Sequence, residues 1–182
     1  MNSDLTFRIT IIGTRQVGKS SIIFRLQQHQ FPLGYHPTDD YFISSRILIN
    51  DQLIKLKIYD RDQSEPYEKF RSKTYSKTDG FILCFSLSDY QAFNFVESYW
   101  MREIMGYYPN KPYILVGTKS DSRKSISKSM GTKLKNAISA ASYVECSALN
   151  DTNIVPVFES IVNAIIARQS PPEKKKSCCL LI

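Results

Sequence analysis

The sequence has no long apolar run, few histidines and few cysteines, and each shortage excludes a class of protein. No segment of the 182 residues approaches the roughly 18 consecutive apolar residues of a membrane-spanning helix. The only two histidines, His29 and His36, are too few for a histidine-based metal site. Four cysteines, two of them adjacent near the C-terminus, do not make a disulfide framework. We therefore expect an intracellular globular protein, with Cys84 and Cys146 as core thiols inside apolar segments.

The N-terminus and the distribution of charge exclude three further classes. Asp4 lies where a signal peptide would be apolar or basic, so we expect no secretion signal. Residue 2 is Asn2 rather than glycine, which argues against N-myristoylation. The net charge of +7 comes partly from the run Lys174–Lys176, and the rest of the chain has no basic stripe interleaved with aromatic residues. We therefore expect no nucleic-acid partner.

Apolar runs and helical spacings alternate along the chain, which predicts an α/β fold. Strands are expected at Phe7–Ile12, Phe42–Ile49, Leu53–Tyr59, Gly80–Ser86, Lys111–Gly117 and Tyr143–Cys146. Helices are expected at Lys19–Gln28, Tyr67–Tyr75, Tyr90–Gly106, Lys128–Ala140 and Thr152–Arg168. Continuous apolar strands alternating with helices favour a mostly parallel, doubly wound sheet, and the Asn50-Asp51 turn adds one antiparallel edge strand. We predict one domain, residues 1–169, followed by a flexible tail, residues 170–182.

The most specific motif is Gly13-Thr14-Arg15-Gln16-Val17-Gly18-Lys19-Ser20, which matches the phosphate-binding pattern GxxxxGK[ST]. It follows a predicted strand and precedes a predicted helix, as the motif requires. Backbone N–H groups of such a loop surround phosphate oxygens at a helix N-terminus. Lys19 is expected to reach the β- and γ-phosphates, and Ser20 is expected to hold Mg²⁺. The predicted phosphate-binding residues are Gly13, Arg15, Gln16, Val17, Gly18, Lys19, Ser20 and Ser21.

Two shorter motifs indicate which base is bound. One strand runs into Thr118-Lys119-Ser120-Asp121, and the last strand runs into Ser147-Ala148-Leu149. A carboxylate at Asp121 can accept hydrogen bonds from both N1–H and the 2-amino group of guanine. Adenine lacks both donors and would leave the carboxylate without partners. The order of the three motifs therefore predicts a guanine nucleotide.

With these motifs the chain resembles a small GTPase of the Ras superfamily. The TKxD form of the base motif, the stretch Phe81–Leu87 and the segment Phe31–Thr38 are similar to Rho/Rac proteins. The resemblance implies a P-loop NTPase G domain, with a six-stranded mostly parallel sheet and about five helices, that binds GTP or GDP with Mg²⁺. It also implies individual roles. For the base, Phe31 is expected to pack against guanine, Lys119 to lie along it, and Ser147 and Ala148 to contact it through their backbone. For the phosphates and the metal, Tyr35 is expected to cover the phosphates, Thr38 to bind Mg²⁺ when the γ-phosphate is present, and Asp60 to support Mg²⁺ through water.

The chain departs from the family pattern in the residues for hydrolysis. The second switch of the family begins Asp-x-x-Gly-Gln, whereas here Gln63 and Ser64 follow Asp60-Arg61-Asp62. Ser64 replaces the glutamine that orients the attacking water, and its side chain is too short for that role. Arg15 stands where Ras-type proteins have a glycine in the phosphate loop. We therefore predict slow GTP hydrolysis that activating proteins stimulate poorly.

Several alternatives remain open at this point. Gln63 could act one residue early, or Arg15 or Arg61 could supply positive charge, so that hydrolysis survives. The chain could instead be a pseudo-GTPase that stays loaded with GTP and acts as a scaffold. A phosphotransferase using another base is a third reading, but it needs an acceptor site and a lid that the sequence does not supply.

The segments expected to meet partners also differ from the Rho pattern. Between Asp121 and Glu145 there is room for one helix but not for the insert helix of most Rho proteins. Asp39-Asp40 replace an apolar pair that docks effectors in Rho and Rac proteins, which favours more basic partners. Effectors are expected at residues 35–41 and 60–75, and exchange factors are expected as regulators.

The C-terminal tail predicts a lipid anchor. Cys179-Leu180-Leu181-Ile182 is a C-a-a-X box, which makes Cys179 the prenylation site, and Cys178 could carry a palmitoyl group. Lys174–Lys176 would add about 1 kcal/mol each at an anionic membrane surface. We therefore expect the cytoplasmic side of the plasma membrane or of endomembranes, with a cytosolic pool and a prenyl-binding dissociation inhibitor as a partner.

Overall fold

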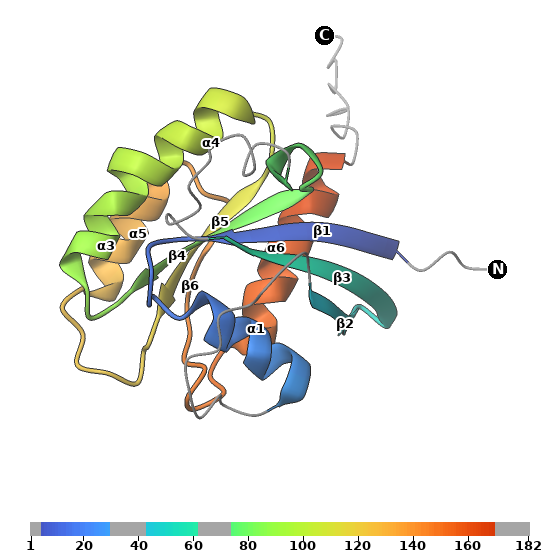
Figure 1. Ribbon diagram of the computed structural model, residues 1–182, viewed down its shortest axis with the longest axis horizontal. Helices are drawn as coiled ribbons and strands as arrows, with labels where there is room; N and C mark the ends of the chain where they lie inside the picture. The colour runs from blue at the N-terminus through green and yellow to red at the C-terminus, as the bar shows by residue number, and fades with distance from the viewer. Residues whose placement is uncertain (1–4, 30–42, 62–73, 170–182) are drawn as a thin grey trace, which may run out of the picture.

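A six-stranded sheet forms the centre of the protein (Figure 1). The computed structural model describes residues 5–29, 43–61 and 74–169. The strands lie in the order β2-β3-β1-β4-β5-β6, with β2 antiparallel to β3 and every other neighbouring pair parallel. Their bounds are β1 Leu5–Ile12, β2 Ile43–Ile49, β3 Gln52–Arg61, β4 Gly80–Ser86, β5 Tyr113–Thr118 and β6 Tyr143–Glu145. The prediction of a mostly parallel sheet with one antiparallel edge strand is confirmed.

Helices cover both faces of this sheet. Their bounds are α1 Lys19–Gln28, α3 Tyr90–Phe95, the π-helical stretch η1 Val96–Trp100, α4 Met101–Tyr107, α5 Lys128–Ala137 and α6 Ile154–Gln169. In Figure 1, α1 and α6 lie on one face, and α3, α4 and α5 lie together on the other. The strands therefore bury side chains on both faces, which is why β4 and β5 are buried at every residue. Cys84 on β4 and Cys146 after β6 are buried free thiols, as expected.

Most of the described elements agree with the sequence prediction to within two residues, and the differences have local causes. Helix α5 ends at Ala137 rather than Ala140 because Ser139 has a left-handed backbone with φ 57°. Helix α6 begins at Ile154 rather than Thr152 because Asp151 and Asn153 have φ of 57° and 56°. A helix cannot pass through left-handed residues.

Two further helix predictions have a different outcome. The stretch predicted as one helix over 90–106 is helical throughout, but its middle turn is the π-helix η1. Most of the predicted helix 67–75 lies outside the described residues, and only Thr74–Ser76 is seen, as helix. One helix, α5, separates β5 from β6, which agrees with the expected lack of an insert helix. No helix in the described ranges is long and apolar enough to cross a membrane.

Candidate guanine-nucleotide site

The phosphate-loop motif connects the end of β1 to the start of α1. Gly13 has φ 156°, and a Cβ at this position would lie 2.3 Å from the backbone oxygen of Cys84 on β4. Gly18 has φ 99° and is the N-cap of α1. Glycine suits both positive backbone angles, and at Gly13 it is also required by the close approach to β4. The two glycines therefore fix the path of the loop against the carboxyl end of the sheet, where ligands bind in open α/β folds.

Lys19 and Ser20 begin α1, and both side chains turn toward the carboxyl end of the sheet. The Lys19 side chain is buried, with the residue 5% exposed, and its Nζ donates hydrogen bonds to the carbonyls of Gly13 at 3.0 Å and Thr14 at 2.9 Å. An ammonium group is thus held inside the curve of the phosphate loop. Ser20 Oγ donates a hydrogen bond to the carboxylate of Asp60, near the end of β3.

The Ser20–Asp60 pair has the chemistry that Mg²⁺ requires. A hydroxyl and a carboxylate are hard oxygen ligands, and Mg²⁺ is usually held by one or two protein ligands together with phosphate oxygens and water. The described residues contain no group of three His, Cys, Asp or Glu side chains that could hold a metal by themselves. The donors present therefore fit a magnesium ion that binds together with a nucleotide.

A pocket of about 130 Å³ adjoins the phosphate loop. Its walls are formed by Gly18, Ser21, Ile22, Thr118, Lys119, Asp121, Ala148 and Leu149. Thr118 Oγ1 donates to the carbonyl of Val17 and is also 3.1 Å from the carbonyl of Phe85. This hydroxyl ties the end of β5 to the phosphate loop. The predicted phosphate and base motifs therefore form one continuous site.

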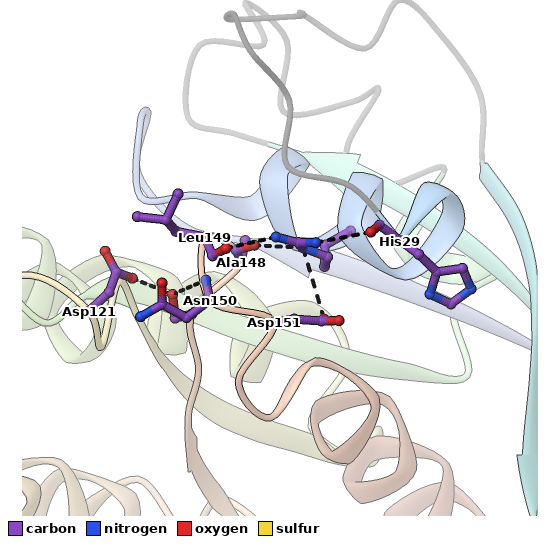
Figure 2. A network of polar contacts seen from close by, with 8 residues as sticks. His29, Asp121, Ala148, Leu149, Asn150 and Asp151 are labelled. Carbon is purple, nitrogen blue, oxygen red and sulfur yellow. Dashed lines mark hydrogen bonds and ion pairs between the residues drawn. The ribbon is translucent and has the colours of Figure 1, made fainter.

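Asp121 is held in place by a turn that follows β6. Ser147 Oγ donates to one carboxylate oxygen of Asp121 and accepts a hydrogen bond from the backbone N–H of Asn150 at 3.1 Å. The backbones of Ser147 and Thr152 pair in both directions, at 2.9 and 3.0 Å, and close the turn. Figure 2 shows Asp121 beside this turn. The sequence predicted a backbone role for Ser147, whereas the structure also gives its side chain a role.

Arg25 of α1 belongs to no sequence motif, yet it contacts the base-motif turn. Arg25 Nε and Nη2 donate to the carbonyls of Ala148 and Leu149, both at 2.7 Å. Arg25 follows the buried Ile22 by one helical turn, and the sequence alone would predict a solvent-exposed basic side chain at this position. Long-range pairing to residue 148 cannot be read from local spacing.

Two thiols lie beneath the site and stay protonated. Burial, and to a lesser degree the neighbouring Asp121 carboxylate, raises the pKa of Cys146 to about 12. Burial likewise raises the pKa of Cys84 well above its ordinary value. Neither thiol is therefore a nucleophile at neutral pH.

The structure does not test every predicted residue. Phe31, Tyr35, Thr38, Gln63, Ser64, Cys178 and Cys179 lie outside the described residues, as do Asp39-Asp40 and the lysine run. Arg15 is described and is exposed at the tip of the phosphate loop. Thus the residues expected to bind phosphate and base are brought together, while those expected to act in hydrolysis are mostly outside the described part.

Comparison with known proteins agrees with this geometry. The model of the Ras family matches residues 8–167. The chain is also 35% identical over 179 residues to the "Ras-like GTP-binding protein RhoL" of Drosophila melanogaster, an alignment that covers 96% of this chain and 94% of the relative.

Proposed function

Because the chain belongs to the Ras family and is a Rho-like GTP-binding protein, we propose that it is a membrane-anchored guanine-nucleotide switch that hydrolyses GTP slowly. The observation that carries guanine-nucleotide binding is a pocket of about 130 Å³ that is lined by Asp121 together with Gly18 of the phosphate loop. A carboxylate held by Ser147 at this point selects a base with two adjacent donors. The P-loop next to it supplies the phosphate contacts.

Each part of the site has a separate task in this proposal. Backbone N–H groups between Gly13 and Ser20 bind the phosphates, and the Lys19 ammonium neutralises their negative charge. Ser20 and Asp60 would hold Mg²⁺, which supplies charge neutralisation at the β- and γ-phosphates when bound. Thr38 of the segment 35–41 would complete that set when the γ-phosphate is present. Effectors and exchange factors would then bind to residues 35–41 and 60–75.

Slow hydrolysis follows from the residues after Asp60. Phosphoryl transfer in this class depends on positioning a water and on charge stabilisation, and an arginine supplied by a partner adds about 10³–10⁵ in rate. Ser64 is too short to orient that water, and Gln63 stands where the family has a glycine. Arg15 adds a bulky side chain at the tip of the phosphate loop. The predicted consequence is a long-lived GTP-bound form.

A single-turnover assay tests this proposal. Purified protein is loaded with GTP and Mg²⁺, and GDP formation is followed by chromatography. We expect GTP to persist for hours, and we expect the double variant Gln63→Gly/Ser64→Gln to hydrolyse it faster because it restores the family pair. Rapid conversion by the unmodified chain would refute slow turnover and mean that Gln63, Arg15 or Arg61 has taken over the missing role. Complete retention even in the double variant would favour the pseudo-GTPase reading.

Membrane anchoring rests on the tail and needs its own test. Cys179 is proposed to carry the prenyl group, Cys178 a palmitoyl group, and Lys174–Lys176 to add attraction to anionic lipid. This places the protein on the cytoplasmic side of the plasma membrane or endomembranes, with a cytosolic pool held by a prenyl-binding dissociation inhibitor. Cell fractionation should find Cys179→Ser wholly cytosolic and Cys178→Ser only partly released. An unchanged distribution of Cys179→Ser would refute prenyl anchoring.

A further inference from the structure

Arg25 joins two walls of the base pocket. Its side chain, 12% exposed, lies one turn beyond Ser21 and Ile22, which line the pocket from α1. Its guanidinium donates to the carbonyls of Ala148 and Leu149 at 2.7 Å each, and these two residues also line the pocket. A third hydrogen bond, from Nη1, reaches the carbonyl of His29 at 3.0 Å. Figure 2 shows Ala148 and Leu149 on one side of this network and His29 on the other.

The turn 147–152 depends on Arg25 for the orientation of two peptide planes. The Ser147–Ala148 plane is fixed by the hydrogen bond from Thr152 N–H to the Ser147 carbonyl at 2.9 Å. The next two planes are fixed through their carbonyls by Arg25. In a trans peptide the N–H points opposite to the C=O, so the hydrogen bond to the Ala148 carbonyl directs the Leu149 N–H away from the Arg25 guanidinium. The planar guanidinium fork fixes both carbonyls at once, which a lysine ammonium cannot reproduce.

This orientation matters for the edge of guanine next to Asp121. When N1–H and the 2-amino group face that carboxylate, the neighbouring 6-oxo group faces the turn that carries Ala148 and Leu149. The 6-oxo oxygen is an acceptor and requires N–H donors there. Donors that are already oriented lose little conformational entropy on binding.

We propose that Arg25 is a positioning residue for guanine: through the Ala148 carbonyl it orients the backbone N–H of Leu149 toward the 6-oxo group and thereby slows nucleotide release. The inference rests on the proposed guanine-nucleotide site. Because α1 begins at Lys19 of the phosphate loop, Arg25 also couples the phosphate half of the site to the base half.

The ion pair of Arg25 contributes less than these hydrogen bonds. Its Nε lies 3.9 Å from an Asp151 carboxylate oxygen, and the Asp151 side chain is 54% exposed. Exposed pairs at this distance contribute little and are screened by salt. Asp151→Asn should therefore leave nucleotide release nearly unchanged, which separates the hydrogen-bonding role from a general effect of charge.

The test measures release of a fluorescent GDP from the full chain, with two variants of Arg25 and one control. Arg25→Met keeps the aliphatic stem and removes every donor, and Arg25→Lys keeps one charge and one point of contact. Arg102→Met is the matched control, because Arg102 is exposed on α4 away from the pocket. We expect GDP release to accelerate about tenfold or more in Arg25→Met, less in Arg25→Lys, and not at all in Arg102→Met. A tenfold change corresponds to about 1.4 kcal/mol, the size of one hydrogen bond between the turn and the 6-oxo group.

A second ligand separates positioning from a loss of folded structure. The diphosphate of 2-aminopurine riboside keeps the 2-amino group but lacks both the 6-oxo group and the N1–H of guanine, so it should bind more weakly than GDP to every form of the protein. Its affinity, measured by equilibrium competition, should nevertheless change less than threefold in either Arg25 variant (about 0.7 kcal/mol), because it has no 6-oxo group for the turn to contact. Equal fold losses of affinity for GDP and for the analogue would overturn the inference. GDP release at the wild-type rate in both Arg25 variants would also overturn it. If Arg25→Met does not fold, the same comparison with Arg25→Lys decides. Failure of the unmodified chain to retain GDP would overturn the proposed function, whereas normal retention with insensitive variants overturns this inference alone.

Discussion

Two serines contact the same carboxylate of Asp121, and they should differ sharply when replaced. Ser147 is 1% exposed, and its hydroxyl donates to Asp121 while accepting from the Asn150 N–H. Ser122 is exposed, and its hydroxyl is 3.3 Å from the other carboxylate oxygen. Ser147→Ala removes a part-buried, charge-assisted contact, and Ser122→Ala removes a solvated one. The second variant is therefore the matched control for the first.

The expected magnitudes differ for stability and for binding. A hydrogen bond to a charged group contributes about 1.5–3 kcal/mol to the free energy of unfolding, so Ser147→Ala should lose an amount of that order. The contact exists before the nucleotide binds, so binding loses only its ordering effect. Immobilising one side chain costs about 0.5–1.5 kcal/mol, which corresponds to about 2- to 12-fold in the dissociation constant.

Urea unfolding and titration with GDP measure the two quantities on the same preparations. Ser122→Ala should change both by little, because a long hydrogen bond in water is replaced readily by solvent. The reasoning would be refuted if Ser147→Ala bound GDP as tightly as Ser122→Ala. In that case Asp121 would be held by the backbone of its own loop, and the turn 147–152 would not orient it.

Two further predictions concern packing and protonation. A Cβ on Gly131 of α5 would lie 2.2–2.5 Å from ring atoms of Tyr143, whose hydroxyl is tied to Glu145 at 3.0 Å, so Gly131→Ala should lower the free energy of unfolding by about 1–3 kcal/mol. Gly106→Ala, with no atom within 4 Å of its new Cβ, should instead raise it by up to about 1 kcal/mol, and urea unfolding of both variants decides. Burial raises the pKa of Cys146 from 9.0 to about 12, so above pH 9 the unfolded chain has lost a proton that the folded chain keeps. Stability should therefore fall as pH rises past about 9, less steeply in Cys146→Ala, and unfolding at pH 7–10 with equal slopes for both would contradict this.

The parts of the site that could be predicted are those in which one local segment supplies both the geometry and the chemistry. Gly13 to Ser20 needs only its own backbone angles and the strand before it, so the motif predicted the strand, loop and helix start that the structure shows. The continuous apolar runs of β4 and β5 likewise predicted a sheet that is buried on both faces. In these cases local propensity and the tertiary fold agree.

The remaining parts depend on pairs that are far apart in the sequence. Arg25 meets Ala148 across 123 positions, and Ser147 meets Asp121 across 26. No spacing rule links such residues, since their meeting is a product of strand order rather than of local pattern. The left-handed residues Ser139, Asp151 and Asn153 shortened two helices for a related reason, because hydrogen bonds formed in the folded chain decide where each helix ends.

The described residues proposed to bind nucleotide hold one another in place. Lys19 is held by carbonyls of its own loop, Thr118 by Val17 and Phe85, and the base turn by Arg25 and the Ser147–Thr152 pair. Each of these contacts joins two parts of the site within the described residues. We therefore expect tight guanine-nucleotide binding from this set, and the slow hydrolysis proposed from Gln63 and Ser64 would make nucleotide exchange the step that controls this switch.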